Sequence, residues 1–127
     1  MEDKKVFETD KAAVTGGPYS QAIIHNGIIY VSGQGAVDPR TNEIKPGTVE
    51  EEAGLALENL RIILAEAGSS LDRVLTVTVY LLDIAEYARF NEVYKQYFRE
   101  KRPARTCIQA GNLPFNTRVE ITATAYI

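Results

Sequence analysis

The sequence of 127 residues contains a single cysteine, Cys107, and a single histidine, His25. One cysteine excludes an internal disulfide, and so small a supply of His and Cys disfavours a zinc site, so no metal is expected. No uninterrupted apolar run reaches the roughly 18 residues that a membrane-spanning helix needs. The first residues, MEDKKVFETDK, also lack the apolar segment of a secretion signal. These absences predict a reduced, cytoplasmic protein without membrane contact.

An excess of positive charge is also missing. Fourteen Lys and Arg stand against seventeen Asp and Glu, which gives a net charge of −3. Because non-specific nucleic-acid binding depends on basic surface, nucleic acid is not expected as a partner. The short basic run at Arg99, Lys101 and Arg102 is interpreted as the solvated end of a helix. With 45% hydrophobic and 24% charged residues, the composition is that of a soluble globular protein. The length fits one domain over residues 1–127.

Two segments have the periodicity of amphipathic helices. The first begins at Thr48, where Glu51 completes a capping-box pattern, and its apolar positions recur until a stop at Gly68. The second is expected to begin at Asp83 and to be ended by Pro103. The apolar positions expected for this second helix are Ile84, Tyr87, Ala88, Phe90, Tyr94, Tyr97 and Phe98.

Alternation with a period of two residues predicts strands in the rest of the chain. The predicted strands are residues 21–25, 28–32, 74–82, 105–109 and 118–127. Asn26-Gly27 is a strong two-residue turn signal, and it predicts a hairpin between the first two strands. The order of helices and strands predicts an α+β fold, in which a mixed β-sheet packs one face against both helices.

The two longest predicted strands each have one apolar face and one face rich in Thr and Tyr. The apolar positions are Leu75, Val77, Val79 and Leu81 in one strand, and Val119, Ile121, Ala123, Ala125 and Ile127 in the other. We expect the helices to cover this face. The opposite face is neither apolar enough for a core nor charged enough for an ordinary surface, so it predicts a homo-oligomer with sheet-to-sheet contacts. A solvated sheet face is the alternative, because Thr and Tyr are also good strand formers.

Two charged side chains on successive predicted strands are candidates for chemistry. The guanidinium fork of Arg105 suits a planar carboxylate. Glu120 is a carboxylate on a face rich in Thr and Tyr, where it could act as a general base. Each could equally form a structural ion pair. Their strands follow one another in the sequence and could pair across the connection at residues 111–117.

Other polar side chains have simpler interpretations. A catalytic pair of Cys107 and His25 lacks a convergent third group, so Cys107 is interpreted as a small buried side chain and His25 as a residue flanking a turn. Asn91 lies among the apolar positions of the second helix, where it needs a hydrogen-bond partner from nearby backbone or from a pocket. Tyr19 follows a Gly-Pro turn and could belong to the core, an interface or a site.

Short motifs along the chain together resemble one family. They are GGPYSQAI, IIYVSGQGAVDP, ENL, LAEAGSSLDRVLTVTVYLLD, FNEVYKQYF, PARTCIQ, LP and VEITATAY, in order from Gly16 to Tyr126. On these motifs the sequence resembles the Rid/YjgF family of reactive intermediate deaminases. The resemblance implies a chorismate-mutase-like α+β fold. It also implies a homotrimer whose sheets form a central barrel, with three sites between subunits.

The same resemblance implies an activity. Family members hydrolyse 2-imino acids, which pyridoxal-phosphate enzymes such as threonine dehydratase release, to 2-oxo acids and ammonia. The chain is therefore expected to be a 2-iminobutanoate/2-iminopropanoate deaminase that needs no metal and no cofactor. Arg105 matches the arginine that binds the carboxylate, Glu120 the acidic residue near the attacking water, and Cys107 a backbone contact to substrate and water. The substrate-binding positions of the family are matched by Tyr19, Ser32, Gly33 and Asn91.

One motif departs from the family pattern. Many deaminase members have Glu-Ile-Glu-Ala in the last strand, whereas Thr122 follows Glu120-Ile121 here, which leaves the substrate preference open. Two alternative functions also stay open. An endoribonuclease or translation inhibitor is disfavoured by the net negative charge. A trimer that binds small 2-oxo acids without turnover is disfavoured by Glu120, which carboxylate binding alone would not need.

Overall fold

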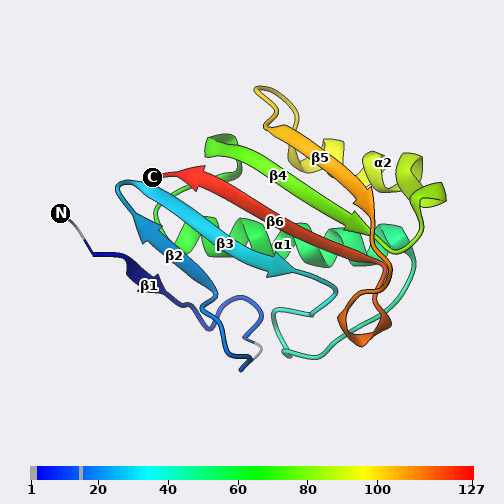
Figure 1. Ribbon diagram of the computed structural model, residues 1–127, viewed down its shortest axis with the longest axis horizontal. Helices are drawn as coiled ribbons and strands as arrows, with labels where there is room; N and C mark the ends of the chain where they lie inside the picture. The colour runs from blue at the N-terminus through cyan, green and yellow to red at the C-terminus, as the bar shows by residue number, and fades with distance from the viewer. Residues whose placement is uncertain (1–2, 15) are drawn as a thin grey trace.

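One six-stranded β-sheet with two α-helices on one of its faces makes up the structure, a computed structural model that describes residues 3–14 and 16–127 (Figure 1). In chain order the elements are β1 (Lys5–Phe7), β2 (Ala22–His25), β3 (Ile28–Gln34), α1 (Val49–Glu66), β4 (Val74–Leu81), α2 (Tyr87–Tyr97), β5 (Ala104–Gln109) and β6 (Val119–Tyr126). Short 3₁₀ turns lie at Leu71–Arg73, Ile84–Glu86 and Pro114–Asn116. The predicted α+β fold is confirmed. The sequence did not predict β1, whose three residues are too few to show an alternation.

The strand order is β1-β2-β3-β6-β4-β5. All neighbours are antiparallel except β4 and β5, which are parallel because α2 carries the chain back between them. The prediction that the strands of Arg105 and Glu120 pair is therefore wrong. The crossover places β5 at one edge of the sheet, and the chain then enters β6 on the other side of β4.

Helix α1 follows its predicted boundaries closely. The Thr48 hydroxyl accepts a hydrogen bond from the Glu51 amide at 3.1 Å, and the Glu51 carboxylate accepts one from the Thr48 amide at 2.9 Å. This reciprocal capping box begins the helix. Gly68, with φ of +87°, follows its end. The core side chains of the helix are Val49, Ala53, Ala56, Leu57, Leu60, Ile63 and Leu64.

The second helix is shorter than predicted. The Asp83 carboxylate caps a separate 3₁₀ turn by accepting the Ala85 amide at 2.9 Å, and α2 itself covers only Tyr87–Tyr97. Phe90, Tyr94 and Phe98 are buried, whereas Ile84, Tyr87 and Ala88 are exposed. The chain rotates by about 120° per residue in a 3₁₀ turn and by about 100° in an α-helix, so the expected apolar positions do not stay on one face.

A β-bulge makes the predicted faces wrong at the start of β4. The register with β6 shifts between Val74 and Thr76. As a result Val74 is 5% exposed and Leu75, predicted to be in the core, is 44% exposed. From Val77 onward the predicted alternation is confirmed. In β6 it is confirmed from Val119 to Ala125, whereas Ile127 lies beyond the strand and is exposed.

The open face of the sheet has the predicted mixed character. Figure 1 shows α1 and α2 on the other side of the sheet, so no helix covers this face in the part of the chain that is described. Large apolar side chains are exposed there beside half-buried threonines. They include Tyr30, Leu75, Ile108 and Tyr126.

Candidate active site

Arg105 lies on the helix-covered face of β5, where aromatic side chains of α2 surround its guanidinium. Its register partner is Val77, which is part of the core. The guanidinium carbon lies 4.6 Å from the centroid of the Tyr94 ring, 5.4 Å from that of Tyr87 and 5.9 Å from that of Phe90. Nη2 also donates a hydrogen bond to the Tyr87 hydroxyl at 3.0 Å. These contacts hold the cation in place while its remaining N–H groups stay available for an anion.

A cleft of about 340 Å³ opens beside this guanidinium. We call it the arginine cleft, and its lining residues are Asn91, Tyr94, Lys95, Arg102, Pro103 and Arg105. Asn91 Oδ1 and the Tyr94 hydroxyl oxygen are buried without a hydrogen-bond partner among the described residues. Burial raises the pKa of Tyr94 to about 12, although the charges of Arg105 and Arg102 act against that rise. Unpartnered polar atoms of this kind are costly in a folded protein, so this cleft is suited to a polar ligand.

Glu120 lies on the opposite face of the sheet. Its register partner is Tyr80, whose neighbours along β4 point into the core. A Cβ atom on Gly33 would come within 2.6 Å of Glu120 Oε2, so the absence of a side chain at Gly33 makes room for this carboxylate. Burial raises the pKa of the Glu120 carboxyl. The group is a half-buried base candidate beside the backbone of β3.

Glu120 borders a second cleft, of about 90 Å³. We call it the glutamate cleft, and it is lined by Tyr19, Gly33, Phe115, Thr117 and Glu120 among others. Phe115 is 70% exposed and has φ of +62°, a conformation uncommon for a bulky residue. Its ring is therefore presented to solvent at the mouth of the cleft.

A β-bulge in β3 shapes the backbone of this cleft. The register with β6 shifts between Val31 and Gln34, which takes Ser32 and Gly33 out of the regular pairing. The Ser32 amide donates to the Gln21 carbonyl at 3.0 Å, and the Ser32 hydroxyl donates to the Ser20 carbonyl at 2.6 Å. Ser32 thus ties the bulge to the segment that carries Tyr19.

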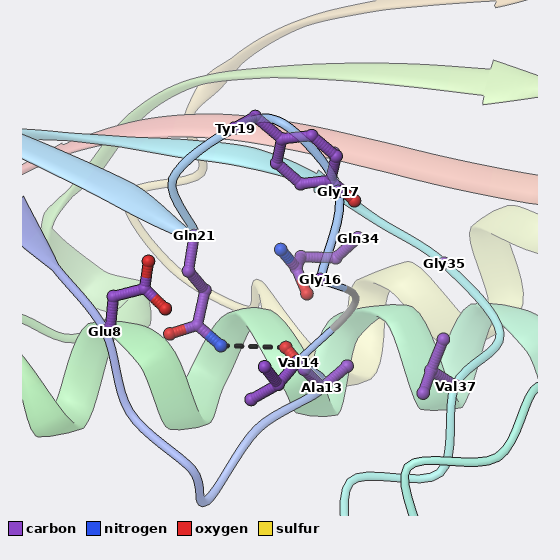
Figure 2. A pocket seen from close by; sticks show the side chains of 11 residues that line it. Glu8, Ala13, Val14, Gly16, Gly17, Tyr19, Gln21, Gln34, Gly35 and Val37 are labelled. Carbon is purple, nitrogen blue, oxygen red and sulfur yellow. Dashed lines mark hydrogen bonds between the residues drawn. The ribbon is translucent and has the colours of Figure 1, made fainter.

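Tyr19 stands above that segment, as Figure 2 shows. It is 55% exposed, and its ring lies over Gly17, where an added Cβ would come within 2.5 Å of Cε1. Below it, Gln21 Nε2 donates to the Ala13 carbonyl at 2.8 Å and anchors the loop (Figure 2). Of the three roles left open for Tyr19, this exposure excludes the core.

The predicted site residues thus gather in two places within one chain. Arg105 and Asn91 line the arginine cleft, whereas Tyr19, Gly33 and Glu120 line the glutamate cleft. The two clefts share no lining residue, and the charged groups point to opposite faces of the sheet. One chain alone therefore does not bring the guanidinium and the carboxylate together.

Cys107 has the features of a structural residue. It is register partner to Val79 and packs against the core. Burial raises the pKa of its thiol, so the reactive thiolate is disfavoured at neutral pH. His25 lies in β2, and three strands separate β2 from β5 in the sheet. The two side chains therefore do not form a catalytic pair.

Several residues of the clefts were not recognised in the sequence. Tyr87, Phe90 and Tyr94 were assigned to the apolar face of a helix, yet they form the platform under Arg105. Arg102 was interpreted as a solvated helix end, yet it lines the arginine cleft. Its position three residues before Arg105 in the sequence could have indicated that it lies in the same cleft. No pattern marked Phe115.

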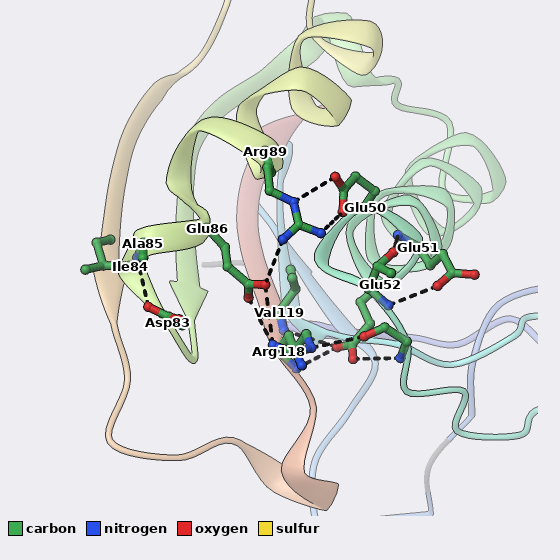
Figure 3. Close-up of polar contacts among 12 residues, drawn as sticks. Glu50, Glu51, Glu52, Asp83, Ile84, Ala85, Glu86, Arg89, Arg118 and Val119 are labelled. Atoms are coloured by element: carbon green, nitrogen blue, oxygen red, sulfur yellow. Dashed lines mark hydrogen bonds and ion pairs between the residues drawn. The ribbon is translucent and has the colours of Figure 1, made fainter.

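A buried glutamate positions the start of β6. Glu52, in the first turn of α1, is fully buried. Its carboxylate accepts hydrogen bonds from the amides of Gly47 at 3.1 Å, Arg118 at 2.6 Å and Val119 at 3.3 Å (Figure 3). Three backbone donors compensate the burial of this carboxylate. They also fix the backbone one residue before Glu120.

Ion pairs extend this arrangement to α2. Arg89 donates from Nη2 and Nε to the Glu50 carboxylate, at 2.7 and 2.9 Å. Glu86 contacts both Arg89, at 3.5 Å, and Arg118, at 3.3 Å (Figure 3). The first turns of both helices and the start of β6 are therefore held together at one end of the sheet.

The described residues offer no cluster for a metal ion. Within residues 3–14 and 16–127, no three side chains of the types His, Cys, Asp and Glu come close enough together to hold one. In the same residues, no helix has the length and apolar character needed to cross a bilayer.

Comparison with known proteins decides the family. The family model described as Endoribonuclease L-PSP matches residues 9–127. The chain belongs to the Rid/YjgF family. This Rid/YjgF protein is 45% identical over 122 residues to the 2-iminobutanoate/2-iminopropanoate deaminase of Bos taurus, covering 96% of this chain and 89% of the relative. It is 46% identical over 123 residues to a RutC family protein of Pyrococcus abyssi, covering 97% of each.

Solved structures of the Rid/YjgF family share the fold. The crystal structure of E. coli TdcF with bound serine is 39% identical in sequence, with a TM-score of 0.90 over 97% of this chain and 98% of that one. The structure of YyfA from Yersinia pestis, described as a member of the conserved Rid protein family, is 34% identical. Its TM-score is 0.94, over 98% of this chain and 100% of that one.

Proposed function

We propose that this Rid/YjgF protein hydrolyses 2-imino acids to 2-oxo acids and ammonia, as a 2-iminobutanoate/2-iminopropanoate deaminase. The observation that carries the proposal is the Arg105 guanidinium, stacked on three rings and without a carboxylate partner among the described residues. Such a preorganised fork is suited to the carboxylate of an amino-acid derivative. The deaminase name of a relative 45% identical to this chain supports the same substrate class.

The active site is assembled between subunits of a homotrimer. The arginine cleft of one subunit supplies Arg105 and Asn91, and the glutamate cleft of the next supplies Tyr19, Gly33 and Glu120. Two observations support this arrangement. The two clefts lie on opposite faces of one chain, and the open sheet face exposes Tyr30, Ile108 and Tyr126 in a way that suits burial against another copy.

The chemistry needs little beyond positioning and one base. Arg105 holds the carboxylate, which directs C2 of the protonated imine toward a water molecule at Glu120. The water oxygen bonds to C2 while Glu120 takes one of its protons, which gives a neutral carbinolamine. Glu120 then returns the proton to nitrogen. As the C2–N bond breaks, the hydroxyl gives its proton to the Glu120 carboxylate, which releases ammonia, leaves the 2-oxo acid and later returns that proton to solvent.

The test is direct hydrolysis of 2-iminopropanoate and 2-iminobutanoate by the wild type and by Arg105→Ala. Two charge-assisted hydrogen bonds are each worth about 1.5–3 kcal/mol. Their loss should therefore lower kcat/KM by about a hundredfold or more. Arg61→Ala is the control, because Arg61 is an exposed arginine of α1 that pairs with Glu58 and lines neither cleft. It should keep wild-type activity.

Equal imine hydrolysis by Arg105→Ala and the wild type would contradict the carboxylate role. RNA cleavage that survives in Arg105→Ala and falls steeply with salt would favour the endoribonuclease instead. Binding of 2-oxobutanoate without any turnover would favour the non-catalytic binder. Sedimentation should give three subunits, and a monomer would contradict the assembled site.

A further inference from the structure

The arginine cleft contains more positive charge than one carboxylate requires. Three of its lining residues, Lys95, Arg102 and Arg105, are cations, and the others are Asn91, Tyr94 and Pro103. Among the residues that the structure describes, no acidic side chain lines it. With about 340 Å³, it lies within the range of roughly 300–1,000 Å³ that is typical of small-molecule sites.

The two arginines of the cleft have no carboxylate partner among the described residues. Arg102 uses Nε to donate to the Phe98 carbonyl at 2.8 Å, and Arg105 uses Nη2 to donate to the Tyr87 hydroxyl. Both guanidinium groups keep further N–H donors. Lys95 differs, because its ammonium contacts Glu92 at 2.8 Å in an exposed pair. The unbalanced charge of the cleft therefore comes from Arg102 and Arg105.

Both arginines line the same cleft as Tyr94. The Arg105 guanidinium carbon lies 4.6 Å from the centroid of the Tyr94 ring. A ligand with a methyl or ethyl side chain would occupy Arg105 alone, whereas a second carboxylate could also pair with the exposed guanidinium of Arg102.

We propose that the arginine cleft selects 2-imino dicarboxylic acids, the imino forms of aspartate and glutamate, with Arg105 on the C1 carboxylate and Arg102 on the side-chain carboxylate. This inference rests on the proposed function and names its substrate class. The two unpartnered atoms of the cleft suit the same ligand. Asn91 Oδ1 can accept a hydrogen bond from the iminium N–H, and the Tyr94 hydroxyl can donate one to a carboxylate oxygen.

The experiment compares 2-iminosuccinate with 2-iminopropanoate in the wild type, Arg102→Gln and Arg99→Gln. Arg99 is a matched control, because its Nε also donates to a backbone carbonyl, that of Gln96 at 3.2 Å, while its side chain lies outside the cleft. We expect Arg102→Gln to lower kcat/KM for 2-iminosuccinate by about tenfold or more, the loss of one charge-assisted pair. For 2-iminopropanoate the change should stay within about twofold, and Arg99→Gln should change neither value.

Calorimetric titration with the products gives a readout that does not depend on turnover. The wild type should bind 2-oxoglutarate or oxaloacetate at least about tenfold more tightly than 2-oxobutanoate, and Arg102→Gln should remove the difference. Equal losses for both substrates would place both arginines on one carboxylate and overturn the proposal. So would no change on Arg102→Gln. A wild type that hydrolyses neither imine contradicts the proposed function, and the titration then still decides whether the cleft prefers dicarboxylates.

Discussion

The arginine cleft and the glutamate cleft hold their charged groups in different ways. Arg105 has a long, rotamer-rich side chain, and the rings of Tyr87 and Tyr94 restrict it. Glu120 has a shorter side chain whose place follows from the backbone, through the bulge at Gly33 and the amides held by Glu52. A long cationic group is positioned by side-chain packing, whereas a short anionic one is positioned by the strand that carries it.

The two clefts also differ in their response to protons. A guanidinium stays charged at all physiological pH values. Burial raises the pKa of Glu120, so the charge of the carboxylate is the one that changes first as pH falls. In the proposed mechanism, binding of the substrate carboxylate and activation of water therefore depend on separate groups, which can be perturbed independently.

The largest expected effect tests whether the two clefts of one active site come from different subunits. Arg105→Ala and Glu120→Gln should each lose about a hundredfold or more of imine hydrolysis when assayed alone. If the two variants are unfolded together, mixed in equal amounts and refolded, about a quarter of the interfaces formed at random will contain both intact side chains. About a quarter of wild-type activity should return. No recovery would show that both groups act within one chain.

The pH profile tests the glutamate cleft alone. A base must be ionised, and the raised pKa of Glu120 moves the acid limb of the kcat profile above the pH expected for an ordinary glutamate. Below that pKa, kcat should fall by about tenfold per pH unit. Glu120→Gln should have low activity without this limb once the uncatalysed rate is subtracted. An unchanged limb in that variant would assign it to another group.

A smaller effect is expected from Gly33→Ala. The added Cβ would meet Glu120 Oε2 at 2.6 Å, so the carboxylate must move, while the backbone at Gly33 is not left-handed. Displacement of the Glu120 carboxylate from its position should lower kcat by about tenfold. Gly54→Ala in α1 is the control, since nothing lies within 4 Å of its added Cβ. It should keep activity and gain up to about 1 kcal/mol of stability.

The smallest effect is expected at Cys107. Its thiol is kept neutral by burial, and only its backbone is expected to face the substrate. Cys107→Ala should change kcat/KM by less than about threefold and lower the free energy of unfolding by about 1 kcal/mol, through lost packing. A loss of kcat/KM as large as that of Arg105→Ala would indicate that the Cys107 thiol takes part in the reaction.

Much of the fold follows from local patterns in the sequence. The capping box at Thr48 and Glu51, the Asn26-Gly27 turn and the alternation in β6 are short-range signals, and each predicted its element correctly. Leu75 was misplaced because a bulge reverses the faces, and nothing in the local alternation marks a bulge.

The site was less accessible to such reasoning. In the sheet, β4 lies between the strands of Arg105 and Glu120. Local sequence patterns do not give the order of strands in a sheet, so the adjacency of these two strands in the sequence wrongly suggested that they pair. The platform under Arg105 consists of apolar positions that look like core in a helical pattern. The strand pattern singled out both charged residues and the family motifs supplied their roles, whereas their separation onto two faces required three-dimensional structure.

The hydrogen bonds of Glu52 link catalysis to folding. Glu52 and Arg118 are 66 residues apart in the chain, so the strand that carries the proposed general base is held at its start by a helix from a much earlier part of the sequence. If the first turn of α1 opens locally, β6 loses those amide contacts while most of the sheet persists. The protein is then expected to lose turnover on heating before it loses its secondary structure.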